Sequence, residues 1–599
     1  MLKTVKNIFP NKYALTSGIF FLICLRIIFD HYQILKNFDF LETISYTGDD
    51  FYYYLSTVQN LRDLKILSFS IDPSAITNGF QYLWFIIQYG LGLIFFENSL
   101  EHIKSIMLVS SLLHIVFCTL VLYTFLKQGI NIIISFISIT FLGSSYVLFS
   151  HLWAGLEIQI YLILIIILVN RLLISSSEVN KKNLLIDAFI IILLFLSRSE
   201  GILFAPFLTL VRFWQIKKKL NIKYLILPPI IFFIFYFFFT YLIFGRITQS
   251  SGLFYSTFLE RSFEEKIKFF IWFFTHYEQH FDNHSPLNIM SKLYHNNFFH
   301  YSVIIVFFLN FIKNSYESSF KKFKYVFFVL IFQYIIIALF YSFNQKIFLI
   351  RYTLISIVPI TIFLTCIMQD IFVNLKIFVR QIFFQLHSGY KNKKNKISFF
   401  ISNYIHTEIF EIINAKYLLL KNKNFFIFPI KALIFIILIF YFNNTLDKNI
   451  DHYQKNSKNR NELHSFYKSG LELQKLKLDG GVGGWNSGMI GFASGNMVLN
   501  LDGRINSEIF SYKNQDGNIL EIDIIKNLIE YLEEKNIRYV VDGKAVVTDI
   551  KPWFYKTSTK CINELFVFEK LLDPKFTAWY HGIALFKIDF ENGKKHCLE

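Results

Sequence analysis

The sequence predicts an α-helical polytopic membrane protein that ends in a small α/β domain outside the membrane. Of its 599 residues, 54% are hydrophobic and 73 are phenylalanine. They form repeated apolar runs of about 18–24 residues, the length that crosses a bilayer. Lysine and arginine gather in short stretches between these runs, as the positive-inside rule expects. After residue 443 the composition becomes polar and contains more glycine.

The positive net charge of this chain does not indicate nucleic-acid binding, because of where the charges lie. A formal charge of +17 would by itself suit a nucleic-acid-binding protein. Much of it, however, lies in clusters between apolar runs, and the chain has no base-reading motif and no soluble basic domain. We therefore expect membrane lipids as partners, and no nucleic acid.

The apolar runs predict about 11 transmembrane helices within a membrane domain that comprises residues 1–442. The first span is too long for a cleavable signal peptide and has no small-residue cleavage site, so we expect it to act as the export signal as well. The candidate spans are 13–31, 103–126, 130–149, 157–174, 184–197, 200–214, 224–244, 299–312, 325–343, 349–368 and 425–442.

The basic clusters predict which ends of the spans face the cytoplasm. These clusters are Lys3, Lys6 and Lys12; Arg171, Lys181 and Lys182; Arg212 and 217–219; Lys313, Lys321, Lys322 and Lys324; and the lysine-rich stretch 376–424. They are all cytoplasmic only if a further apolar run, 80–97, does not cross. We expect that run to be a juxtamembrane or re-entrant helix within a first external loop, 32–102. If it crosses, the count becomes 12 and one loop inverts.

This topology places the N-terminus in the cytoplasm. We expect the chain to lie in the inner (plasma) membrane of the cell. A second long external loop covers 245–298, and 370–424 is expected to hold interfacial amphipathic helices. Residues 443–599 form the extracytoplasmic domain, in which the apolar segments MVLNL and IRYVVDG alternate with a helical pattern at 519–536.

The cysteines and the glycine-rich stretch of the external domain allow limited predictions. Cys561 and Cys597 form a disulfide only if this domain faces an oxidising compartment, and their spacing matches no metal site. The stretch DGGVGGWNSGMIG, at 479–491, fits neither a dinucleotide-binding fingerprint nor a Walker sequence, so we interpret it as turn-rich.

Two adjacent carboxylates stand out beyond the first span. Asp49 and Asp50 precede an aromatic-rich stretch with helical spacing. Aspartate is a good helix N-cap, which is the purely structural interpretation. Acidic residues at a membrane interface are also candidates for function, and two carboxylates are more than a cap needs. One of them could cap the helix while the other takes part in chemistry.

Other charged residues lie at the ends of predicted spans on the same external side. Glu157 begins one span, whereas Arg198 and Glu200 flank a turn between two others. Each could be an interfacial anchor, and the latter two could bond to each other. Arg351 opens a span on the external side, against the positive-inside rule. An arginine on this side usually has an anionic partner, which is either a phosphate, whose geometry suits the guanidinium, or the acidic side chain of a structural ion pair.

The histidines of the second long loop suggest metal binding only weakly. In HYEQH, His276 and His280 have the i, i+4 spacing of zinc ligands on a helix. The sequence is not HExxH and has no evident third ligand, so we interpret the segment as a polar loop and predict no metal site.

Two of these motifs carry a family resemblance. The segment GDDFYYYLSTVQNL, followed by TNGFQYLW at 77–84, resembles bacterial integral-membrane glycosyltransferases of the GT-C fold class that carry DDAFYY and then TNGFHPLW. That class includes the protein O-mannosyltransferases and the lipid A aminoarabinose transferases. The resemblance spans most of the chain, but Gln81 and Tyr82 stand where the family has His-Pro, and Ser199 where it has Pro. Its further segments are WAGLE, SRSEG, RYTLISIVP, VGGWNSGMIGFASGNMVLNLDGRINS and YLEEKNIRYVVD.

The resemblance implies a GT-C-like fold and an inverting glycosyltransferase, transferring a hexose or pentose. The donor would be a sugar linked to polyprenyl phosphate, and the acceptor an extracytoplasmic glycan, lipid or protein. The resemblance does not imply that the reaction requires a cofactor. Some members of the class bind a divalent metal, and nothing in this chain demands one.

The resemblance also implies roles for particular residues. An acidic residue of the first loop is the general base, for which we assign Asp49 first and Asp50 second. The leaving phosphate is assigned to Arg351, together with Arg198. Binding of the sugar or acceptor is assigned to Glu157, Glu200, Asn78 and Tyr53.

Two other functions fit parts of the sequence. A transporter or flippase for a lipid-linked saccharide would be expected to show inverted repeats and broken helices at mid-membrane, whereas this chain has no evident repeat and gathers its acids at one boundary. A non-catalytic envelope assembly protein that keeps the fold is favoured only by the departure at Gln81 and Tyr82.

Overall fold

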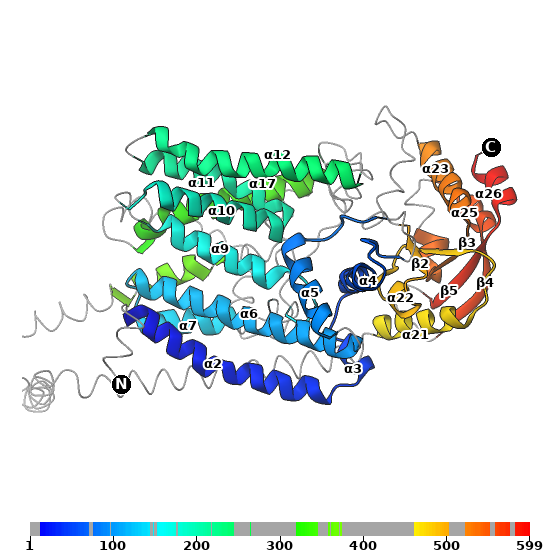
Figure 1. Ribbon diagram of the computed structural model, residues 1–599, viewed down its shortest axis with the longest axis horizontal. Helices are drawn as coiled ribbons and strands as arrows, with labels where there is room; N and C mark the ends of the chain where they lie inside the picture. The colour runs from blue at the N-terminus through cyan, green and yellow to red at the C-terminus, as the bar shows by residue number, and fades with distance from the viewer. Residues whose placement is uncertain are drawn as a thin grey trace, which may run out of the picture.

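The computed structural model of the protein describes residues 12–70, 76–95, 98–143, 148, 152–174, 178–216, 219–244, 264, 267, 319–344, 358–359, 361–370, 372–373, 461–501, 521–550, 557–574 and 581–598. Within these residues the chain is mostly helical. A bundle of helices lies at one end and a unit built on a β-sheet lies at the other (Figure 1).

The helices of the bundle follow the apolar runs of the sequence. They are α2 (Lys12–Asn37), α3 (Phe40–Ile44), α4 (Asp49–Asp63), α5 (Tyr82–Ile94), α6 (Ser99–Lys127), α7 (Ile132–Gly143), α9 (Ile158–Leu172), α10 (Lys181–Ser197), the short 3-10 helix η1 (Ser199–Leu203), α11 (Phe204–Gln215), the 3-10 helix η2 (Lys219–Ile222), α12 (Lys223–Phe244) and α17 (Ser319–Asn344).

Three helices in the described part of the chain are long and apolar enough to cross a membrane, namely α2, α6 and α12. Other predicted spans coincide with α7, α9, α10, α11 and α17, and their crossing stays a prediction. The predicted spans 299–312 and 425–442, and half of 349–368, lie outside the described residues.

The ambiguous run at 80–97 contains a short helix. Helix α5 has 13 residues, which rise about 20 Å, whereas the hydrocarbon core of a bilayer is about 30 Å thick. Its length therefore fits the predicted helix that does not cross.

Two clusters of buried charge mark the two ends of α9 and α10. At one end Asp187 accepts hydrogen bonds from Arg171 Nε (2.6 Å) and Arg212 Nε (2.7 Å). At the other end Arg198 bonds to Glu157. These pairs show that α9 and α10 are antiparallel. They also bring Arg171 and Arg212, both predicted to be cytoplasmic, to the end opposite the motifs that are predicted to be external.

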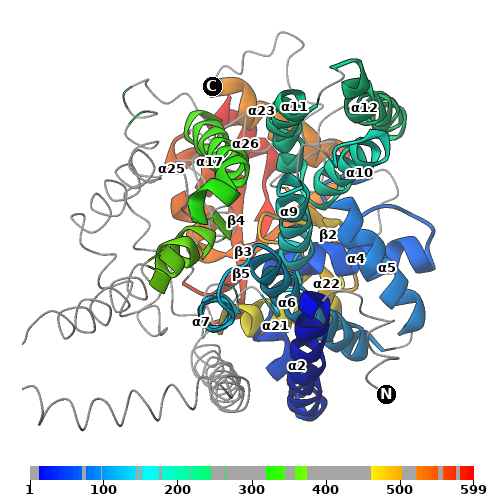
Figure 2. The same cartoon turned by 90° about the vertical axis from the view of Figure 1, so that its left-hand side faces the viewer.

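Helix α4 lies between the bundle and the sheet unit. It is seen end-on in Figure 1 and lengthwise in Figure 2, so it runs across the direction of the long bundle helices. Figure 2 looks along the bundle from the end away from the sheet, and the long helices lie in front of the strands. The C-terminal unit thus covers one end of the bundle.

The C-terminal unit is a mixed sheet of five strands in the described residues, with the order β2-β1-β3-β5-β4. Strand β1 pairs in parallel with β2 and β3, whereas β5 is antiparallel to β3 and β4. Its strands and helices are α21 (Asn461–Lys475), β1 (Gly481–Gly484), α22 (Gly488–Ala493), β2 (Val498–Asn500), α23 (Glu521–Glu534), β3 (Ile537–Gly543), a π-helical turn (Val546–Ile550), α25 (Thr559–Leu565), β4 (Phe566–Asp573), β5 (Ile583–Ile588) and α26 (Phe590–Cys597).

These elements confirm the prediction of a small α/β unit. The segment MVLNL contains β2, IRYVVDG is β3, and the helical pattern at 519–536 contains α23. Burial alternates with exposure only weakly along β3, because both faces of this central strand are covered.

A disulfide closes the C-terminal unit. Cys561 in α25 is bonded to Cys597 in α26, with Cα atoms 4.8 Å apart. The three cysteines of the apolar runs, Cys24, Cys118 and Cys366, are free and buried, as expected of small apolar side chains.

Candidate functional site

Asp49 and Asp50 are the first two residues of α4. The N-cap is Gly48, which has no side chain that could form a cap bond. The interpretation of either aspartate as the N-cap of this helix is therefore wrong. Both side chains are half-buried, and their negative charge lies at the positive end of the helix dipole, where it is stabilised.

Asp49 bonds to the C-terminal unit. Its Oδ1 accepts the backbone N–H of Met489 over 2.7 Å, in the first turn of α22. The preceding residue is Gly488, and a Cβ atom there would lie 2.8 Å from the same Oδ1, which is closer than real Cβ contacts come. Glycine at 488 is thus what allows α22 to approach the carboxylate so closely.

One face of α4 continues this contact. Tyr53 and Asn60 follow Asp49 at helical spacing, so the three side chains point the same way. The Nδ2 of Asn500 lies 3.5 Å from the hydroxyl of Tyr53, and Asn496 donates to Asn60 Oδ1 over 3.0 Å. Three side chains of one helix face therefore bond to the C-terminal unit.

The start of α4 also contacts the WAGLE loop, which belongs to the helical bundle. The backbone N–H of Gly48 donates to the carbonyl of Ala154 over 3.4 Å. The next carbonyl, that of Gly155, accepts from Trp84 Nε1 (2.7 Å) and from Gln88 Nε2 (3.1 Å), both in α5. The GDD, TNGFQYLW and WAGLE segments, which are far apart in the sequence, thus meet at one place.

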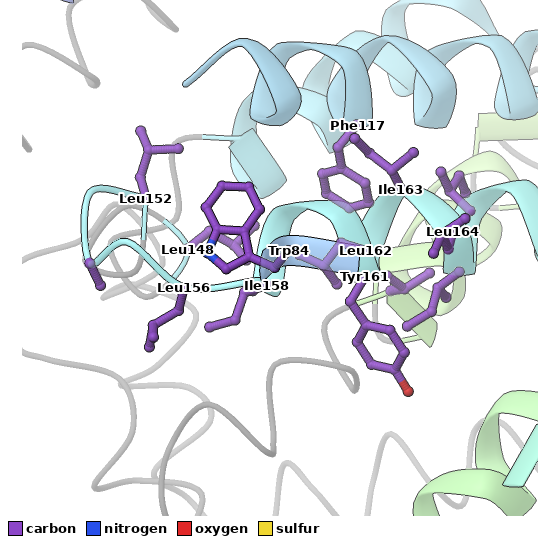
Figure 3. Close-up of a cluster of buried hydrophobic side chains, with 14 of the residues drawn as sticks. Trp84, Phe117, Leu148, Leu152, Leu156, Ile158, Tyr161, Leu162, Ile163 and Leu164 are labelled. Carbon is purple, nitrogen blue, oxygen red and sulfur yellow. The ribbon is translucent and has the colours of Figure 1, made fainter. Parts of the chain in front are cut away.

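The apolar side chains around this loop fix it to the bundle. Figure 3 shows Trp84 beside Leu156 and Ile158, at the point where the loop enters α9. All three side chains are buried. Gly155 has a φ of +77°, a conformation that favours glycine, and the ring of Phe51 from α4 packs directly against it.

The SRSEG turn joins the same assembly through its charges. Arg198 bonds to Glu157 Oε1 over 2.7 Å and to Glu200 Oε1 over 3.0 Å, and the guanidinium lies over the ring of Tyr161. The predicted bond between Arg198 and Glu200 is confirmed. The cation is thus paired with two carboxylates in the described structure, and its predicted role toward a donor phosphate stays a prediction.

The remaining predicted binding residues lie in packed positions. Asn78 is fully buried in the segment that leads into α5, and Tyr53 is 6% exposed. Nearby, the hydroxyl of Tyr54 accepts the backbone N–H of Gln81 over 3.0 Å, which ties this segment to α4. The substrate-binding roles of Asn78 and Tyr53 stay predictions.

A neighbouring phenol is ruled out as a base. Burial raises the pKa of Tyr52 far above its ordinary value, and the negative charge of Asp49 raises it further, although a hydrogen bond of 2.6 Å to Thr47 opposes the shift. Tyr52 is therefore neutral near pH 7, and the carboxylates are the groups that can take a proton.

Two parts of the predicted chemistry lie outside the described residues, namely Arg351 and the histidine loop with His276 and His280. Within the described part of the chain, no three histidine, cysteine or acidic side chains are grouped as metal ligands.

The contact that the glycine-rich stretch makes is not predicted from the sequence. The stretch 479–491 is expected only to be turn-rich, whereas in the structure its Met489 bonds to Asp49. Glycine makes this contact possible, because a Cβ atom at Gly488 or Gly491 would meet the predicted first external loop, at Asp49 and at the ring of Phe69 respectively. The sequence shows these glycines but not the residues that they approach. Comparison with protein-family models finds no family that matches the chain, and a search of curated proteins finds no match.

Proposed function

We propose that this protein is a membrane glycosyltransferase that moves a sugar from a polyprenyl-phosphate-linked donor to an extracytoplasmic acceptor. The observation that carries the proposal is the meeting of four separate segments at the start of α4. The GDD segment bonds to the WAGLE loop and to the C-terminal unit, and WAGLE bonds to the SRSEG turn. These are the segments that resemble the GT-C class.

The position of this assembly suits a lipid-linked donor. It lies at the end of the bundle that faces the sheet unit (Figure 1). Arg171 and Arg212, which bond to Asp187, lie at the opposite ends of α9 and α10. A polyprenyl chain stays in the bilayer, so its sugar phosphate reaches the protein at a membrane boundary. A site at the end of the bundle meets that requirement better than one at mid-membrane.

The disulfide supports an external location for the C-terminal unit. Disulfides persist in oxidising compartments and are rare in the cytosol. Cys561–Cys597 therefore favours the topology in which α22, and with it Asp49, faces outward. The inner membrane as location and the count of about 11 spans belong to this proposal.

The proposed reaction is a single displacement. A carboxylate, Asp49 first and Asp50 second, takes the proton of an acceptor hydroxyl as its oxygen attacks the anomeric carbon. A new C–O bond forms while the bond from the anomeric carbon to the phosphate oxygen breaks, and the electron pair leaves with the phosphate. Attack from the face opposite the leaving group inverts the anomeric configuration.

The departing phosphate needs positive charge. Arg351 is the first candidate, because the sequence places it at the external start of a predicted span, against the positive-inside rule. Arg198 comes second, since its guanidinium is shared between Glu157 and Glu200. Those two carboxylates, when they are held by Arg198, can accept hydrogen bonds from sugar or acceptor hydroxyls with their remaining lone pairs.

The test uses Asp49→Asn and Asp50→Asn, made separately, with labelled polyprenyl-phosphate sugar and membranes that contain each variant. The variant that lacks the base should lose transfer by about 10²- to 10⁴-fold and still bind the donor. Asp63→Asn is the matched control, because Asp63 lies at the far end of the same helix and bonds to Arg62.

Three results would contradict the proposal. Full transfer by both variants would remove the carboxylates from the mechanism. Movement of labelled lipid across the membrane without any glycosylated product would indicate a transporter. Absence of both transfer and flux in the wild-type chain, with surface glycans still dependent on it, would indicate an assembly protein.

A further inference from the structure

We propose that Asp542 is a positioning residue of the transferase, an inference that rests on the proposed function. It lies in β3 of the C-terminal unit and holds the loop 485–489, and this loop in turn orients the carboxylate of Asp49. The C-terminal unit is then part of the catalytic apparatus and not only a cover over it.

Asp542 is a fully buried carboxylate surrounded by N–H donors. Its Oδ2 accepts the backbone N–H groups of Trp485 and Asn486, each over 3.0 Å. Its Oδ1 accepts from Asn486 Nδ2 (2.9 Å) and from the backbone of Gly543 (2.7 Å). Burying an ionised carboxylate is costly, and four hydrogen bonds are what offset that cost. Three of the four come from the loop that leads to Met489.

A second side chain holds the same loop from the neighbouring strand. Asn500, at the end of β2, donates to Ser487 Oγ over 3.0 Å. Its Nδ2 also lies 3.5 Å from the hydroxyl of Tyr53 in α4. The loop is therefore fixed on one side by β3 and on the other by β2, and it has little freedom to move relative to the sheet.

The loop transmits this rigidity to Asp49 through two contacts. The Met489 N–H donates to Oδ1, and the Cα of Gly488 lies where any added side chain would collide with the carboxylate. A displacement of the loop by about 1 Å would turn or release the carboxylate, and misplacement on that scale costs a catalytic group about 100-fold in rate.

The loop therefore gives a way to move the base without altering it. Gly488→Ala adds one methyl group against the Asp49 carboxylate and leaves both aspartates in place. Asp542→Ala removes the three bonds from Asp542 that hold the loop, and Asp542→Asn keeps part of them. The controls are Gly90→Ala, where an added Cβ meets nothing within 4 Å, and Asp549→Asn at an exposed site of the same unit.

The experiment measures transfer kinetics of the full chain with labelled polyprenyl-phosphate sugar. We expect Gly488→Ala and Asp542→Ala to lower kcat by about 10- to 100-fold without changing KM for the donor. Asp542→Asn should fall between Asp542→Ala and the wild type, and both controls should match the wild type. Unchanged kcat in Gly488→Ala, or an equal rise in donor KM in place of the kcat loss, would overturn the inference.

A second measurement does not depend on activity. Hydrogen exchange of the peptide 485–492, followed by mass spectrometry in the purified chain, should quicken in Asp542→Ala and in Asp49→Ala, and not in the two controls. Unchanged exchange in both aspartate variants would show that Asp542 does not hold the loop on Asp49. If the wild type transfers no sugar but exchange quickens as expected, the proposed function fails while the link from Asp542 to Asp49 stands.

Discussion

The carboxylate of Asp49 and the backbone N–H of Met489 are 440 residues apart in the chain and form a hydrogen bond of 2.7 Å. The bond joins the first turn of α4 to the first turn of α22. The first N–H groups of a helix have no partner within that helix. Here the carboxylate of Asp49 in α4 accepts one of those of α22. The membrane part and the C-terminal unit are therefore connected at the residue that we propose as the base.

Asn60 is expected to be the most sensitive polar residue of this junction. Its Nδ2 lies 3.0 Å from each of the three consecutive carbonyls of Ser68, Phe69 and Ser70, and its Oδ1 accepts from Asn496. Asn60→Asp keeps the shape but places a carboxylate oxygen against those carbonyls. We expect the free energy of unfolding to fall by about 1–3 kcal/mol or more.

Thermal unfolding of the purified chain in detergent measures this loss, and limited proteolysis reports whether the C-terminal unit detaches first. Gln59→Glu is the neighbouring control, since Gln59 is half-buried and bonds only to Ser99 in the described structure. If Asn60→Asp unfolds at the wild-type temperature, the junction does not depend on this side chain.

The buried charges at the SRSEG turn should behave as one coupled group. Arg198→Met leaves the buried Glu157 and the half-buried Glu200 without this cation, which is expected to cost about 3–5 kcal/mol of stability, mostly through Glu157. Adding Glu157→Gln to Arg198→Met should recover part of that loss, because one uncompensated charge is removed. The double-mutant cycle is measured by thermal unfolding, and strictly additive effects would contradict the coupling.

Thiol labelling tests on which side of the membrane the C-terminal unit lies. In intact cells, a membrane-impermeant maleimide should label Cys561 and Cys597 only after treatment with a reductant, because the two form a disulfide. Cys24, Cys118 and Cys366 are buried and free and should stay unlabelled in the folded chain. Labelling of the C-terminal pair without reduction would contradict the disulfide, whereas labelling only after the cells are lysed would contradict the proposed topology.

The helix that ends in Cys597 provides a test of pH dependence. Asp589 is the N-cap of α26, and hydrogen bonds from the backbone and side chain of Asn592 lower the pKa of its carboxyl below the ordinary value. A lowered pKa means that the stabilisation is complete above the pKa of the unfolded chain and disappears as the pH falls through that of the folded chain.

Asp589→Ala should therefore destabilise the C-terminal unit by about 1 kcal/mol at neutral pH. The difference from the wild type should shrink as the solution is acidified past the ordinary range of an aspartic acid. Asp589→Asn keeps a good N-cap without a titrating group, so its stability should lack this pH dependence. Unfolding of the full chain across the acidic range makes the comparison, and a constant difference for Asp589→Ala would contradict the assignment.

Much of the fold is readable from local sequence patterns. Apolar runs predict the helices of the bundle because a helix buried in lipid or protein must be apolar over most of its length. The predicted span 184–197 ends at the last residue of α10, and the segment IRYVVDG is β3 as expected, whereas Glu200, predicted to start the next span, lies in the short helix η1 before α11. The N-cap at Gly48 was not predicted, because aspartate is as acceptable at the first positions of a helix as at its cap.

The sequence by itself determined which segments of this protein are helices or strands and which carry polar and charged groups, because periodicity and composition act over a few neighbouring residues. Only the tertiary structure decided the partners: Met489 for Asp49, Glu157 for Arg198, and the loop 485–486 for Asp542. Hydrogen bonds and ion pairs form between atoms a few ångströms apart in space. No local pattern specifies which distant residue the folded chain brings to that distance.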